Sequence, residues 1–124
     1  MEIQRLIKKA EEVENRLPLR SDYTAGAVGA ALLAADGRTY TGISLSMACG
    51  IGFCAEHAAV AEMLKNGTTR VEMIVAVSKG RILPPCGRCR ELLAQLDPEN
   101  MDCQVILGED RVLSLDQLLP EHWL

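Results

Sequence analysis

Residues 54–90, CAEHAAVAEMLKNGTTRVEMIVAVSKGRILPPCGRCR, show the pattern of a helix, a strand and a second helix. The first helix is predicted over 54–66 and ends before Gly67, a residue typical of helix C-termini. Residues 71–78 (VEMIVAVS) favour a strand. The second helix, over 86–96, follows two prolines and stops before Pro98. Helices alternating with strands predict an α/β fold.

Further elements are predicted on both sides of this segment. Residues 26–35 (GAVGAALLAA) suit a helix or a strand by periodicity, but the Asp36-Gly37 turn signal favours a buried strand with a return strand over 38–44. The remaining predicted elements are an amphipathic helix over 2–16, short strands at 104–107 and 112–113, and a terminal helix at 115–119. We therefore expect one domain, 1–124, built as a three-layer α/β/α sandwich. Its mixed sheet would have five strands, with the two cysteine-bearing helices side by side on one face.

Composition limits the classes of function. The 124-residue chain is 48% hydrophobic and carries a net charge of −4, without the basic surface that gripping a nucleic acid polymer requires. The sequence shows no signal-peptide pattern and no apolar run of transmembrane length. Its five cysteines are an odd number, which suits free thiols better than a disulfide framework. We expect a cytoplasmic protein that binds a small molecule and neither nucleic acid nor membrane.

Two motifs supply metal-ligating chemistry. Cys54-Ala55-Glu56 and the Cys86/Cys89 pair together offer three thiols and one carboxylate. Cys86 and Cys89 lie three residues apart, which places them on one face of a helix. Three protein ligands leave the fourth position of a tetrahedral Zn²⁺ free for water, as in catalytic rather than structural sites. Glu56 is then the candidate for moving the protons of that water.

Charge places a condition on this hypothesis. Three thiolates and one Zn²⁺ sum to −1, which weakens zinc as a Lewis acid. Because both motifs open predicted helices, the positive helix N-termini favour the thiolate form and offset part of this charge. Basic side chains adjacent in sequence could supply hydrogen bonds to the thiolates; the candidates are His57, Arg88 and Arg90.

Other interpretations of the cysteines remain open. The Cys86/Cys89 pair alone also fits a thiol redox module. A non-catalytic structural-zinc interaction module would need Cys49 or Cys103 to close a four-cysteine site. The carboxylate at Glu56 and the Pro85-Cys86 start are unexplained by that second alternative.

These motifs resemble the cytidine deaminase superfamily, most closely its small blasticidin S deaminase-like zinc deaminases. The resemblance extends over nearly the whole chain. It is carried by Tyr23-Thr24 with 28–32 (VGAAL), 40–43 (YTGI), 80–90 (GRILPPCGRCR) and Leu118-Leu119-Pro120 followed by Trp123. It implies a zinc-dependent aminohydrolase in which one Zn²⁺ per chain is held by Cys54, Cys86 and Cys89.

The resemblance also implies roles for further residues. Glu56 matches the proton shuttle, and the backbone of Ala55 matches a position that holds the pyrimidine edge. Trp123 matches an aromatic that stacks on the substrate ring, in tetrameric members within a neighbouring subunit's site; an interface or core anchor is the alternative. A homotetramer is therefore expected.

Departures from the family pattern concern the sugar. Many members grip ribose with Asn-x-Glu, where this chain has Ser44-Leu45-Ser46, and Gly26 replaces a base-stacking Phe. We therefore predict deamination of a cytosine-type aminopyrimidine nucleoside or nucleoside analogue, blasticidin S-like, with release of ammonia and with Ser44 and Ser46 as candidate substrate contacts. The alternative within the family is an ordinary cytidine and deoxycytidine salvage deaminase.

Overall fold

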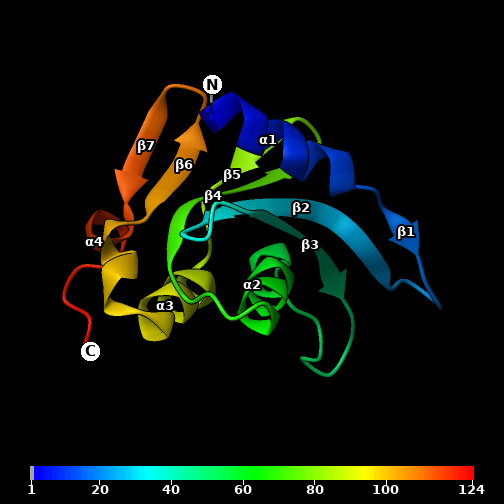
Figure 1. Cartoon of the computed structure of the whole chain (residues 1–124). Helices are drawn as coiled ribbons and strands as arrows, with labels where there is room; N and C mark the ends of the chain where they lie inside the picture. Colours follow the sequence, from blue (N-terminus) through cyan, green and yellow to red (C-terminus); the bar gives the residue numbers. More distant parts are fainter. Residues whose placement is uncertain (1) are drawn as a thin grey trace.

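A mixed β-sheet forms the middle layer of the computed structural model, which describes residues 2–124 (Figure 1). Within those residues the sheet has seven strands, of which β4 and β6 pair in parallel and the other neighbours antiparallel. The strands are β1 (Leu17–Pro18), β2 (Thr24–Ala34), β3 (Thr39–Ser46), β4 (Val71–Ser78), β5 (Arg81–Leu83), β6 (Gln104–Gly108) and β7 (Arg111–Ser114). The helical elements are α1 (Glu2–Val13), α2 (Ala55–Lys65), α3 (Gly87–Leu96), the 3-10 helix η1 (Pro98–Asp102) and α4 (Leu115–Leu118).

Helices cover both faces of the sheet, which confirms the predicted α/β fold with a mixed sheet and flanking helices. Figure 1 shows α1 on one face, with α2 and α3 on the other. The alternation of side chains along β4 explains the two cores. Met73, Val75 and Val77 pack with α1, whereas Ile74 belongs to the core under α2 and α3. The two predicted cysteine-bearing helices therefore share one face of the sheet.

The five predicted strands correspond to β2, β3, β4, β6 and β7, with ends shifted by a few residues. The sequence did not predict β1 and β5, which have only two and three residues and so offer no periodicity to detect. Helix α1 stops at Val13 rather than at residue 16. The burial of Ala30, Ala31 and Leu32 confirms that β2 is covered on both faces.

Two glycines let the helices approach the sheet closely. A Cβ at Gly42 of β3 would lie 2.4 Å from the backbone nitrogen of Ala59 and 2.6 Å from the carbonyl oxygen of Ala55, both in α2. On the opposite face, a Cβ at Gly29 would lie 2.4 Å from the carbonyl oxygen of Ala10 in α1. The position of α2, and of the residues at its start, thus depends on a missing side chain at Gly42.

The β2–β3 hairpin is held by Asp36, as its Asp-Gly turn signal predicts. The Asp36 carboxylate accepts hydrogen bonds from Tyr40 Oη (2.7 Å), the Arg38 backbone N–H (2.9 Å) and Thr68 Oγ1 (3.1 Å). The hydrogen bond from Tyr40 is the largest of several influences that lower the pKa of Asp36. This carboxylate links the hairpin to the loop that follows α2.

A buried asparagine joins two further segments on the α3 side, namely α3 and the start of β4. Asn100 of η1 accepts a hydrogen bond from the Val71 backbone N–H at 2.7 Å and donates to the carbonyl oxygens of Leu93 (3.0 Å) and Thr69 (3.1 Å). Because a buried amide needs such partners, Asn100 determines how α3 leads back to the sheet. Among residues 2–124, no helix combines the length and the apolar character needed to cross a membrane.

Candidate active site

Three cysteines meet at the N-termini of α2 and α3. Cys54 is the N-cap residue of α2 and Cys86 that of α3, both with extended backbone and neither using its side chain as a cap. Cys89 lies one turn further along α3 and is buried. The Sγ atoms of Cys54 and Cys86 are 3.5 Å apart, as are those of Cys86 and Cys89. The two helix starts thus bring together thiols that lie 32 residues apart in sequence.

This arrangement fits a tetrahedral zinc site. All three Sγ atoms lie within 4.8 Å of one another. With Zn–S bonds of about 2.3 Å, the sulfurs of a tetrahedral site are roughly 3.8 Å apart, close to the spacing found here. Neither Cys49, which is exposed, nor Cys103, which is in the core, joins the cluster formed in residues 2–124. The donor set is therefore three thiols, which leaves one coordination position for a non-protein ligand.

The three thiols differ in how readily they ionise when no cation is bound. Burial raises the pKa values of Cys54 and Cys89, and the carboxylate of Glu56 raises them further. Burial acts in the same direction on Cys86, but hydrogen bonds from the backbone N–H of Cys89 and from the two other thiols outweigh it and lower its pKa. The thiolate form is thus favoured at Cys86 and disfavoured at Cys54 and Cys89, and a bound divalent cation would stabilise it at all three.

Glu56 occupies the first turn of α2 beside the thiols. Its side chain is buried, at 5% exposure, and it lines the same pocket as Cys54 and Cys86. Burial raises the pKa of Glu56, while its own backbone N–H and the Cys89 thiol act in the opposite direction. A carboxyl group with a raised pKa is suited to both accepting and donating a proton near neutral pH.

A pocket of about 250 Å³ opens over these groups. Two predicted substrate contacts, Ala55 and Ser44, line it. The Ser44 Oγ accepts a hydrogen bond from the Val28 backbone N–H at 3.0 Å, so the hydroxyl retains its own proton to donate. The rest of the wall is mainly apolar, formed by Val28, Phe53, Ala76, Leu83 and Pro84.

The structure separates Ser46 from Ser44. Ser46 lines an adjoining open groove of about 370 Å³, together with Leu45, Met47, Gly50, Gly52, Phe53, Cys54 and Arg88. The two serines lie two residues apart near the end of β3 but line different hollows. Phe53 and Cys54 form the boundary between the groove and the pocket, because both line each of them.

The three predicted charge-balancing residues have different surroundings. His57 Nδ1 lies 3.6 Å from the Cys89 Sγ, within hydrogen-bonding distance for sulfur. Burial and the nearby guanidinium of Arg88 lower the pKa of His57, so at neutral pH it offers a hydrogen bond rather than a charge. Arg90 donates instead to the carbonyl oxygens of Pro85 (2.8 Å) and Leu118 (3.0 Å), tying the start of α3 to α4.

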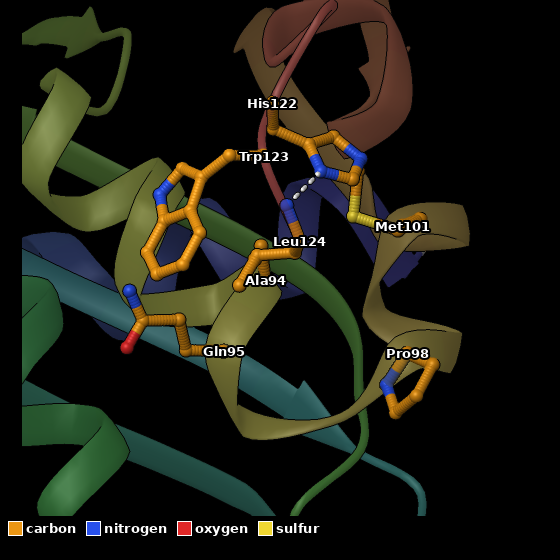
Figure 2. Close-up of a pocket in the computed structure, with 7 residues that line it drawn as sticks. All are labelled: Ala94, Gln95, Pro98, Met101, His122, Trp123 and Leu124. Carbon is orange, nitrogen blue, oxygen red and sulfur yellow. Dashed lines mark hydrogen bonds between the residues drawn. The ribbon is translucent and has the colours of Figure 1, made fainter.

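Trp123 lies in a different part of the structure from the three thiols. It lines a separate pocket of about 480 Å³ with Ala94, Gln95, Pro98, Met101, His122 and Leu124. Figure 2 shows its ring next to the α3 residues Ala94 and Gln95. Its side chain is 83% exposed, and it is absent from the lining of the thiol pocket. The structure therefore does not bring Trp123 into the thiol pocket of its own chain.

Several pocket residues were not predicted from the sequence. Val28, Leu83 and Pro84 are apolar residues of a kind found throughout the chain, so no local signal marks them. Phe53 directly precedes the Cys-Ala-Glu motif, and this position was a usable signal, since residues flanking a helix-start ligand are carried into the same site.

Comparisons with known proteins agree with this geometry. The family model for the cytidine and deoxycytidylate deaminase zinc-binding region matches residues 1–105. The chain is 35% identical to the cytidine deaminase of Halalkalibacterium halodurans, over 97% of this chain and 92% of that protein. It is 29% identical to the blasticidin-S deaminase of Bacillus cereus, over 75% and 74% of the two chains.

Solved structures show the same fold. The crystal structure of cytidine deaminase from Mycobacterium tuberculosis superimposes with a TM-score of 0.83 at 29% identity, covering 99% of this chain and 98% of that one. The cytidine deaminase from Mycobacterium leprae gives 0.79 at 30% identity, covering 98% and 99%. The three-thiol cluster, the shared fold and the family match lead to one conclusion: the chain is a zinc-dependent deaminase of the cytidine and deoxycytidylate deaminase family.

Proposed function

We propose that this enzyme hydrolyses the exocyclic amine of a cytosine-type aminopyrimidine nucleoside or nucleoside analogue to a carbonyl and releases ammonia. The observation that carries the proposal is the position of buried Glu56 in the pocket that Cys54 and Cys86 also line. A pocket of about 250 Å³ suits a single planar ring, and the adjoining groove of about 370 Å³ leaves room for the ring's substituent. The net charge of −4 argues against a nucleic acid polymer as substrate.

In this proposal the zinc ligands are Cys54, Cys86 and Cys89, and one Zn²⁺ per chain supplies Lewis-acid activation of water when bound. Glu56 takes up the two protons of the attacking water in turn, and delivers one to the ring nitrogen and the other to the amine that leaves as ammonia. The backbone at Ala55, in the pocket wall, holds the edge of the pyrimidine. The apolar residues Val28 and Leu83 exclude bulk water, which strengthens these polar interactions.

The proposal leaves two choices for the substituent on the substrate ring, a ribose or the substituent of a nucleoside analogue. In the pocket lining, the uncharged polar side chain is Ser44, whose hydroxyl oxygen already accepts the Val28 N–H. Ser46 lines the open groove next to this pocket instead. The Asn-x-Glu pattern of many family members offers an amide and a carboxylate to the ribose. Two short serine hydroxyls would bind a ribose more weakly, which supports a nucleoside analogue such as blasticidin S as substrate. Similarity to a protein named blasticidin-S deaminase agrees with this choice.

Ordinary cytidine or deoxycytidine salvage is the second candidate. It is favoured by the relative named cytidine deaminase, which is 35% identical and matches over 97% of this chain. A panel of cytidine, deoxycytidine, cytosine, blasticidin S and aminated purines separates the two candidates. Ammonia release with the highest kcat/KM on an analogue supports the first, and the highest value on cytidine or deoxycytidine supports the second. No ammonia from any pyrimidine would refute both.

Zinc content tests the site itself. We expect one zinc per chain in the wild type, and loss of both zinc and ammonia release in Cys54→Ser, Cys86→Ser and Cys89→Ser. Cys49→Ser is the matched control, because Cys49 is exposed and outside the cluster, and it should retain both. Full ammonia release by a zinc-depleted protein would contradict the proposed zinc chemistry.

The assembly is proposed to be a homotetramer in the cytoplasm, in which Trp123 contributes to a neighbouring chain's site. Its 83% exposure and its separation from the thiol pocket of its own chain support this role. The five free cysteines suit a reducing compartment. Light scattering should give four chains per particle. Trp123→Ala should raise KM while the tetramer persists. If the variant instead dissociates, and its KM is unchanged at protein concentrations high enough to restore the tetramer, Trp123 is an interface anchor.

A further inference from the structure

We propose that Phe53 is the aromatic wall against which the substrate's aminated ring packs, an inference that rests on the proposed deaminase function. Phe53 lines the thiol pocket together with Cys54, Ala55 and Glu56. It also lines the two neighbouring grooves, so this residue lies where three hollows meet. At 39% exposure, the ring retains surface that a ligand could cover.

The other aromatic residues of this chain are poorly placed to contact a substrate ring in the thiol pocket. The chain has one phenylalanine, one tryptophan and two tyrosines. Tyr40 is buried and hydrogen-bonded to Asp36, and Trp123 lines the separate C-terminal pocket. Tyr23 is absent from the pocket lining. A planar ring entering the pocket would therefore find one aromatic surface from its own chain.

Gly26 does not provide an alternative surface. Its φ of +78° is a left-handed conformation, and a Cβ there would lie 2.4 Å from the carbonyl oxygen of Asn15. A side chain at position 26 would thus be directed at the segment after α1, whereas the pocket lies among β2, β3 and the α2 start. Position 26 is therefore unsuited to presenting an aromatic ring to the substrate, and Phe53 approaches the pocket from another segment.

The backbone holds Phe53 firmly in this position. Its N–H and carbonyl both pair with Leu45 of β3, at 2.9 Å each. The preceding residue, Gly52, has no room for a side chain, because a Cβ would lie 2.3 Å from the Leu45 carbonyl oxygen. The segment is thus pressed against β3 immediately before the zinc-ligand candidate Cys54. A positioned ring loses little entropy on stacking, and base–aromatic stacking of this kind contributes measurably to affinity.

Two substitutions test this role in the full-length, zinc-loaded protein. Phe53→Leu keeps an apolar side chain but removes the aromatic face, and Phe53→Tyr keeps that face. We expect Phe53→Leu to raise KM roughly 5- to 100-fold with a smaller change in kcat. Phe53→Tyr should stay near wild type. The rise should be equal for cytosine and cytidine, because the contact is with the ring that they share.

A binding measurement complements the kinetics. Calorimetric titration with uridine, the product-like ligand, should show the same loss of affinity in Phe53→Leu and its recovery in Phe53→Tyr. Zinc per chain and Tm are measured in each variant. If Phe53→Leu keeps its zinc and its KM is within twofold of wild type, the inference is wrong. A KM rise confined to cytidine would overturn the ring contact in favour of a sugar contact.

The outcomes also distinguish this inference from the proposed function. A zinc-loaded wild type that releases no ammonia and binds no uridine refutes the function, and the Phe53 inference with it. An active wild type with an unaffected Phe53→Leu refutes the Phe53 inference alone. If both Phe53 variants lose zinc and Tm together while KM of the zinc-loaded fraction is unchanged, Phe53 is a structural residue and the inference is refuted.

Discussion

His57 Nδ1 lies 3.6 Å from the Sγ of Cys89, which joins the two cysteine-bearing helices across the thiol cluster. His57 is on α2 and Cys89 on α3. In one tautomer the neutral ring donates its Nδ1 proton to sulfur. Such a hydrogen bond would spread the negative charge of three thiolates without adding a titrating cation. Of the three basic residues predicted to offset that charge, His57 has the most direct contact with a thiol.

His57→Ala should therefore weaken zinc binding by about 10- to 100-fold, the usual cost of removing a partner that orients a metal ligand. Competition with a chromogenic chelator at fixed pH measures the affinity. His122→Ala is the control, because His122 lies in the C-terminal pocket. Equal zinc affinity in His57→Ala and wild type would show that the contact with Cys89 has no energetic role.

Glu56→Gln should retain one zinc per chain but lose turnover by about 10²- to 10⁴-fold, because an amide of similar size cannot exchange the protons. Ammonia release and zinc content are measured on the same preparation. Glu62→Gln, on the same helix, removes an exposed carboxylate that pairs with Lys65 at 2.9 Å and should leave turnover unchanged. Turnover in Glu56→Gln near the wild-type value would remove Glu56 from the mechanism.

Gly42→Ala should destabilise the fold by about 1–3 kcal/mol, because the added methyl would displace the backbone of α2. Zinc affinity should fall as well, since Cys54 is the N-cap of that helix. Thermal unfolding and chelator competition measure the two effects. Gly108→Ala is the matched control: its Cβ would meet Arg111 at an ordinary 3.7 Å, so stability should hardly change. Equal unfolding temperatures for the two variants would contradict the close approach at Gly42.

Asp36→Asn should reduce stability at neutral pH and lose its effect in acid. The pKa of Asp36 is lowered in the folded protein, so its contribution is present above the unfolded value of about 3.9 and is lost as pH falls through the folded value. The Tm difference between wild type and Asp36→Asn should therefore shrink as pH falls below about 4. Asp110→Asn, in the exposed β6–β7 turn, is the control. A difference that grows in acid would reverse the assigned direction.

The local elements were largely predictable because their signals are local. Apolar residues at strand and helix spacing, the Asp36-Gly37 turn and the proline before Cys86 each act over a few residues. They identified β2, β3, β4, α2 and α3 within a few residues of their ends. The exceptions, β1 and β5, form only because longer strands offer them an edge to pair with.

The chemistry of the site follows from local sequence patterns: the spacing of Cys86 and Cys89 places two thiols on one helix face, and Cys54-Ala55-Glu56 sets a carboxylate close to a third. The other residues that surround this chemistry are known only from the folded structure. It paired Ser44 with Val28, directed Arg90 to two carbonyl groups, kept Trp123 out of its own chain's pocket and brought Phe53 into it. These relationships join segments far apart in the chain, and their geometry follows from how α2 and α3 pack on the sheet rather than from any local pattern.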